Sequence, residues 1–173
     1  GQAIAMGCGD PDLLTMLLDA GEPVDRHSPK VKGGSWAPLI QACDRTARKR
    51  PIHKLDDVTL IFAYVTRTTS LHVAAYIGAL PAANLLLQRD AGVNSTANPK
   101  GMTPLHLAAI GGHEDMCARL LAVGAAVDRK DKRGRTALWY AARLGHEAVR
   151  RRLLLVSAAT NSQRRDWRNR RNG

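Results

Sequence analysis

The chain has 173 residues, enough for one domain or one short repeat array. Hydrophobic residues make up 45% of it and aromatic residues only 4%. A core must therefore be built from Leu, Ala, Val and Ile, which favours packed helices and argues against an aromatic-rich β-sandwich. The formal net charge of +11 comes entirely from residues 129–173, because the acidic and basic residues of 1–128 cancel. A basic surface confined to one region is informative about partners.

The three cysteines, Cys8, Cys43 and Cys117, lie far apart and form no CxxC motif or Cys/His pair. They argue against a disulfide framework and a structural zinc, and they favour a reducing compartment, which we take to be the cytoplasm. The longest apolar run, residues 58–65, is far shorter than the ~20 residues that a membrane-spanning helix needs. The first twenty residues carry three aspartates and no initiator Met, so we expect a processed or partial chain without a signal peptide.

The opening segment is expected to start inside a helix and to contain a second one. Residues 17–25 read Leu-Leu-Asp-Ala-Gly-Glu-Pro-Val-Asp, in which a glycine follows the apolar pair. A glycine at that position is typical of a helix C-terminus. Residues 27–35 are rich in Pro, Gly and Lys, which predicts a loop.

The second segment has the most degraded pattern. A helix is expected from near Trp36, where residues 37–43 read Ala-Pro-Leu-Ile-Gln-Ala-Cys. Pro51 falls where the partner helix should run, and residues 55–65 are the better helical stretch. We therefore expect residues 44–68 to be the least ordered part of the helical region.

The next three segments repeat one pattern at a nearly constant interval. Residues 69–75 read Thr-Ser-Leu-His-Val-Ala-Ala, residues 101–109 Gly-Met-Thr-Pro-Leu-His-Leu-Ala-Ala, and residues 134–142 Gly-Arg-Thr-Ala-Leu-Trp-Tyr-Ala-Ala. Their second halves match too, since residues 86–94 and 120–128 both begin Leu-Leu and end in a Val followed by Asn or Asp. Copies with both halves in register indicate a repeat architecture.

The start of each copy has the chemistry of a helix N-terminus. Thr103 and Thr136 are good N-caps, and Pro104 takes the first helical position, where its missing N–H costs nothing. Leu105 and Ala108 then follow at helical spacing.

Glycines mark the expected helix ends. Gly112 and Gly145 stand where a first helix must end, and Gly124 ends a second helix. The polar run 129–133 is then the projecting turn between units. One such helix pair cannot bury its own apolar face, so stability must come from stacking.

The last helix is expected to end at Val156. Residues 160–173 carry five arginines and few hydrophobic residues, which predicts a disordered tail. Trp167 within the tail is a candidate stacking or anchoring group. The three arginines at residues 150–152 fit a helix C-terminus, where cations complement the helix dipole.

These motifs resemble the ankyrin repeat, whose Thr-Pro-Leu-His-x-Ala signature and period of about 33 residues they share. The resemblance covers residues 1–159 and is strongest from 69 to 155. It implies an all-α fold, an α-solenoid of stacked helix-turn-helix pairs with projecting β-turn fingers, in about five units. The expected units are 1–33, 34–66, 67–100, 101–133 and 134–159, followed by the basic tail 160–173.

The resemblance also implies structural roles. His72 and His106 are expected to bond the backbone of a neighbouring unit, while Trp139 replaces this histidine in the fifth unit. The positions assigned to the structural motif are Thr103, Pro104, Leu105, His106, His72, Gly112, Gly124 and Gly145.

The function implied is a non-catalytic module for protein–protein interaction, a scaffold that binds its partner through the concave face of finger turns and first helices. The expected partner is acidic near the fifth unit and more apolar near the fourth. The candidate contacts are Lys100, Met102, Ile110, Lys132, Arg133, Arg135, Tyr140, Arg143 and Leu144.

No catalytic motif emerges from the sequence. It contains no G-x-S-x-G, no phosphate-binding GxxxxGK[ST] and no GxGxxG, and its carboxylates are scattered singly. We therefore expect no enzyme activity, no cofactor and no metal.

Two alternatives remain open. The basic region 129–173 could bind nucleic acid or anionic lipid, although its tail has one aromatic residue and no known nucleic-acid motif. The chain could also be the targeting segment of a larger multidomain protein. A cytoplasmic monomer is the default expectation, with nuclear import through the arginine-rich tail as the alternative.

Overall fold

The computed structural model describes residues 15–16, 19, 69–96 and 100–171, with the backbone alone for 162–171. The expectations for the loop 27–35 and the degraded stretch 44–68 lie outside these residues. The described part contains no strand, and its main elements are α4 (Ser70–Ile77), α5 (Leu80–Gln88), α6 (Pro104–Gly111), α7 (Glu114–Ala122), α8 (Ala137–Arg143) and α9 (Glu147–Arg171).

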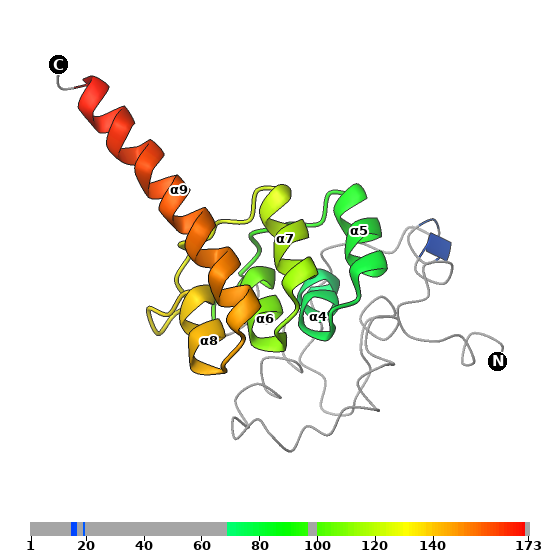
Figure 1. The fold of residues 1–173 in the computed structure, drawn as a ribbon. Helices are drawn as coiled ribbons and strands as arrows, with labels where there is room; N and C mark the ends of the chain where they lie inside the picture. Colours follow the sequence, from blue (N-terminus) through cyan, green and yellow to red (C-terminus); the bar gives the residue numbers. More distant parts are fainter. Residues whose placement is uncertain (1–14, 17–18, 20–68, 97–99, 172–173) are drawn as a thin grey trace.

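The helices form two rows (Figure 1). Helices α4, α6 and α8 lie side by side, α4 packing on α6 and α6 on α8. Each of them also packs on the second helix of its own pair, α5, α7 or α9. The all-α solenoid expected from the sequence is thus confirmed for the described part, while the number of units stays a prediction.

Each first helix begins at a threonine. Thr69, Thr103 and Thr136 are the N-caps of α4, α6 and α8, and all three have extended backbone. The Thr136 hydroxyl accepts the backbone N–H of Trp139 at 3.3 Å. Pro104 is the first residue of α6. The local chemistry of these residues thus determines where the first helix of each unit starts.

The turns after α4 and α6 require glycine. Gly112 has φ +73°, and a Cβ there would lie 2.6 Å from Nδ1 of His146. His146 packs so closely because its Nε2–H donates to the carbonyl oxygen of Ile110 at 3.0 Å. Gly78 and His113 repeat this arrangement one unit earlier. Backbone conformation and the next unit's histidine therefore impose the same requirement.

The second helices end in the same left-handed conformation. Gly124 follows α7 with φ +91°. Asp90 stands at the corresponding place after α5 and adopts φ +61°, which aspartate tolerates better than most residues.

The core is aliphatic and runs continuously through the stack. Leu71, Leu105 and Leu120 are fully buried within it. The alanines at the motif positions are also buried, which lets neighbouring helices approach closely. Cys117 is buried, and burial raises the pKa of its thiol to about 12, so it behaves as a small apolar side chain.

Helix α9 is longer than the sequence pattern indicated. We expected it to end at Val156 and the tail to be disordered from Thr160, but the helix continues to Arg171 and projects beyond the stack (Figure 1). Low hydrophobicity indicates that a segment has few apolar side chains to bury, but it does not prevent the segment from forming a helix. Without Gly or Pro between residues 147 and 171, nothing breaks the helix locally. No helix of the described residues is long and apolar enough to cross a membrane.

Candidate protein-binding face

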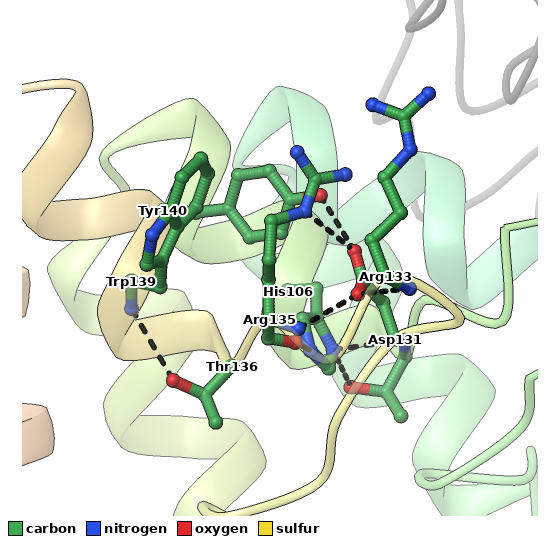
Figure 2. A network of polar contacts seen from close by, with 8 residues as sticks. His106, Asp131, Arg133, Arg135, Thr136, Trp139 and Tyr140 are labelled. Carbon is green, nitrogen blue, oxygen red and sulfur yellow. Dashed lines mark hydrogen bonds and ion pairs between the residues drawn. The ribbon is translucent and has the colours of Figure 1, made fainter.

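The finger turn between α7 and α8 is organised by the carboxylate of Asp131. Its Oδ1 accepts the backbone N–H groups of Arg133 and Arg135, both at 2.8 Å. Its Oδ2 accepts the hydroxyl of Tyr140 at 2.8 Å and Nε–H of Arg135 at 3.1 Å (Figure 2). The Asp131 side chain is only 1% exposed. Three of these bonds order the finger itself, and the bond from Tyr140 ties it to α8.

Asp131 was not among the residues predicted from the sequence. The available signal was an acid standing alone in a basic run, shortly before the turn that contains Gly134. Short acidic side chains of this kind commonly bond nearby backbone N–H groups in turns.

The surroundings of Asp131 keep it ionised. Burial by itself would raise its pKa, but the N–H of Arg135, the hydroxyl of Tyr140 and the N–H of Arg133 together lower it below the ordinary value. The pKa of Tyr140 is raised by burial and by the hydrogen bond that its hydroxyl donates to the carboxylate of Asp131.

Asp131→Asn is expected to lower the free energy of unfolding by about 1–2 kcal/mol at neutral pH. The amide has only one oxygen that can accept hydrogen bonds, whereas both carboxylate oxygens of Asp131 accept them. Since the folded pKa is depressed, the carboxylate's contribution is present above its unfolded pKa of about 3.9 and is lost as pH falls through the folded pKa. Urea unfolding of both chains from neutral to strongly acidic pH should show the difference shrinking. A difference that persists at the acidic end would mean that the charge is irrelevant.

The guanidinium of Arg135 is held in a corner between two aromatic rings. Its central carbon lies 4.9 Å from the ring centre of Trp139 and 4.7 Å from that of Tyr140. The two rings are nearly perpendicular, at 88°, with centroids 5.1 Å apart. Cation–π attraction and the Asp131 contact together immobilise this side chain, which is 17% exposed.

Buried histidines connect the finger of one unit to the first helix of the preceding one. His106 Nδ1 accepts the backbone N–H of Thr103 at 3.1 Å, and its Nε2–H donates to the carbonyl oxygen of Arg135 at 3.1 Å. Burial lowers the pKa of His106, which favours the neutral ring. His72 likewise reaches the carbonyl oxygen of Met102, at 2.9 Å.

Three of the expected contact residues are not available to a partner. Met102 and Ile110 are buried with Leu107 and Tyr140 in a small cluster. They were expected to give the fourth unit an open apolar surface, which was wrong because α8 stacks on α6 and Tyr140 closes over them. Tyr140 itself is only 7% exposed.

The remaining expected contacts lie nearer the surface. Lys132, Arg133 and Arg143 are exposed, and Leu144 is 38% exposed. Lys100 and Arg135 are half-buried.

Trp139 was missed as a surface residue. It occupies the motif position that His106 holds one unit earlier, yet it is 42% exposed whereas His106 is buried. The available signal was the replacement of the motif histidine by an indole in the last pair of helices that the structure describes. Leu154 and Leu155 of α9 are exposed as well.

Positive charge without a neutralising partner gathers on the finger and α8. Within the described residues, no acidic side chain forms an ion pair with Lys132, Arg133 or Arg143. In contrast, Arg150 pairs with Glu147 at 2.6 Å, and Arg152 with Glu114 at 2.7 Å. The charges of α9 that lie near the stack are therefore partly satisfied internally. The part of the chain that the structure describes holds no cluster of three metal-ligating side chains.

Stacked helix pairs, projecting finger turns and histidines that bond across units define a helical repeat protein of the solenoid class. A profile of three ankyrin repeats matches residues 71–166. The chain belongs to the ankyrin-repeat family. Ankyrin repeats are generally protein–protein interaction modules and are typically non-catalytic. No curated protein matches the chain.

Proposed function

We propose that the chain binds a protein partner through a surface of the finger and α8, which we call the fifth-unit face. The observation that carries this proposal is the group of exposed cations, unpaired within the described residues, beside the exposed apolar surfaces of Trp139 and Leu144. The fifth-unit face consists of Lys132, Arg133, Arg135, Trp139, Arg143 and Leu144.

The construction of this face supports a binding role. Trp139 and Arg143 are one helical turn apart on α8 and so lie on the same side of it. The finger is fixed by the four bonds to Asp131. A surface ordered before binding loses little conformational entropy when it binds, so more of the contact energy appears as affinity. Exposed arginine and tryptophan are also the side chains that most often anchor interfaces.

The charges specify the partner's chemistry. An acidic patch on the partner would complement the fifth-unit face and accelerate encounter. In this proposal the chain acts as a monomeric scaffold in the cytoplasm or the nucleus, and its other units hold the face in place.

The second candidate is binding of nucleic acid or anionic lipid through residues 129–173. The observation in its favour is that α9 continues as a helix to Arg171, so the tail arginines stand on a regular element. Such a binder neutralises phosphates, and the logarithm of its affinity for duplex DNA falls with log salt at about −0.9 per contacted phosphate.

The two candidates differ in what tail deletion does. A partner would be recovered on the immobilised full chain, identified by mass spectrometry and measured by biolayer interferometry at about 150 mM salt. Arg133→Ala with Arg143→Ala is expected to speed its dissociation about tenfold or more, because the anchors sit on the repeats. Removing residues 161–173 should mainly slow association. Arg150→Ala is the matched control, since Arg150 is already paired with Glu147.

A short DNA duplex is the probe for the second candidate. Micromolar or tighter binding at the same salt concentration, lost when residues 161–173 are removed, would replace the protein-binding proposal with the nucleic-acid one. A protein partner whose dissociation is unaffected by Arg133→Ala with Arg143→Ala would place the contact outside the fifth-unit face.

A further inference from the structure

We propose that Arg135 is a preformed receptor for a carboxylate, and that an aspartate or glutamate side chain of the partner docks on its two terminal nitrogens. This inference rests on the proposed protein-binding function and adds the chemical group that is recognised.

The guanidinium of Arg135 uses only part of its hydrogen-bonding capacity internally. Its Nε–H donates to Oδ2 of Asp131 at 3.1 Å. Within the described residues, no acceptor is bound to the two terminal nitrogens. A guanidinium has five N–H donors, so the fork formed by Nη1 and Nη2 remains for a ligand. That fork matches the two oxygens of a carboxylate.

The position of the fork is set before any ligand arrives. The side chain is fixed at one edge by Asp131 and lies against the Trp139 and Tyr140 rings. A long arginine side chain usually loses rotamer freedom when it binds. Here that loss has already occurred during folding, which leaves more of the bidentate contact to appear as affinity.

The local charge balance favours an anion. Asp131 neutralises one positive charge, but Arg133 is exposed, is not ion-paired within the described residues and extends to the same side of the finger as Arg135 (Figure 2). The finger therefore keeps a net positive charge around the fork. Lys132 is a further exposed cation of the same finger.

The apolar surface beside the fork favours a carboxylate that is carried on an apolar or aromatic group. Trp139 lines one side of the guanidinium with an indole that is 42% exposed. A carboxylate next to an apolar or aromatic group thus fits both parts of the site.

Phenylacetate is a small probe with these two parts. It would be titrated into the ¹⁵N-labelled full chain, following Nε–H of Arg135 and the indole N–H of Trp139 by NMR. We expect saturable shifts of both signals with a Kd of about 1–10 mM. Phenylacetamide, which lacks the charge, should leave them unchanged. Equal shifts with phenylacetamide would overturn the carboxylate assignment, and tighter binding of phenyl phosphate would reassign the site to phosphate.

Matched variants separate the fork from simple charge. Arg135→Lys keeps the charge but loses the fork, so phenylacetate should bind about tenfold more weakly or worse. Arg150→Lys, on α9 and already paired with Glu147, lies outside the network and should bind it as the wild type does. Thermal unfolding followed by circular dichroism checks that each variant is folded. If Arg135→Lys fails to fold, Trp139→Ala provides a second test, and it should weaken phenylacetate but not acetate.

Unchanged phenylacetate binding in folded Arg135→Lys would refute the receptor. Failure of the receptor proposal can be distinguished from failure of the proposed protein-binding function. A protein partner could bind Arg135→Lys normally but fail to bind the chain with Arg133→Ala and Arg143→Ala. That result would support the protein-binding face and refute the receptor. Phenylacetate binding together with a partner insensitive to all these variants would leave Arg135 as a carboxylate site, but it would overturn both the fifth-unit face and the partner's carboxylate as the occupant of that site.

Discussion

Replacing Leu105 with alanine is expected to lower the free energy of unfolding by about 2–5 kcal/mol, the usual range for a fully buried leucine. Leu105 is 0% exposed and belongs to the continuous core shared by neighbouring units. Its loss would leave a cavity beside α6. Many members of the described core are alanines, which are too small to fill such a cavity.

Urea unfolding followed by circular dichroism measures this change. Leu155→Ala is the control, because Leu155 is 74% exposed and its truncation should change the free energy by no more than about 0.5 kcal/mol. Equal effects of the two substitutions would mean that stacking of α6 does not limit the stability of the array.

The second large effect is expected for His106→Ala, at about 2–4 kcal/mol, because each buried polar group left unsatisfied costs about 1–3 kcal/mol. The ring is 1% exposed, and its removal leaves the N–H and the hydroxyl of Thr103 without their partner. The carbonyl oxygen of Arg135 loses one of its two donors and keeps the N–H of Asp131 at 2.9 Å. The loss also frees the finger, so hydrogen exchange should accelerate at the amides of Arg133 and Arg135, which Asp131 otherwise protects.

The pH dependence provides an independent check on His106. Burial lowers its folded pKa, so its contribution to stability is complete above its unfolded pKa of about 6.5 and is lost as pH falls below that value. The difference between wild type and His106→Ala should therefore shrink on acidification to about pH 5. Unchanged stability of the variant at neutral pH would show that this histidine does not hold the units together.

Much of the site lay beyond sequence reasoning because its residues contact one another only after the units stack. The basic finger and Arg135 were identified from charge and from the family pattern. Asp131 was not, since a lone acid in a basic run does not reveal that Tyr140 and Arg135 will both turn toward it. The opposite error was made at Met102, whose apolar side chain was expected on the surface and is covered by the next unit.

The features that depend on neighbours within one helical turn were predictable from the sequence alone. Thr103 and Pro104 start a helix, and Gly112 permits the left-handed turn that ends it. These features, together with the regular interval between the copies, were enough to predict a solenoid. They are short-range because capping and backbone sterics involve residues a few positions apart.

Which side chains of the repeated pattern are buried depends on how the units stack, and the sequence pattern does not show it. His106 and Trp139 occupy the same position of the motif, but one is buried and the other is 42% exposed. The physical reason is that each unit is covered by the one that follows it, so exposure depends on residues a whole unit away in the sequence. The stacked arrangement also places Arg135 against two aromatic rings of α8 while His106 of the preceding unit holds its carbonyl oxygen.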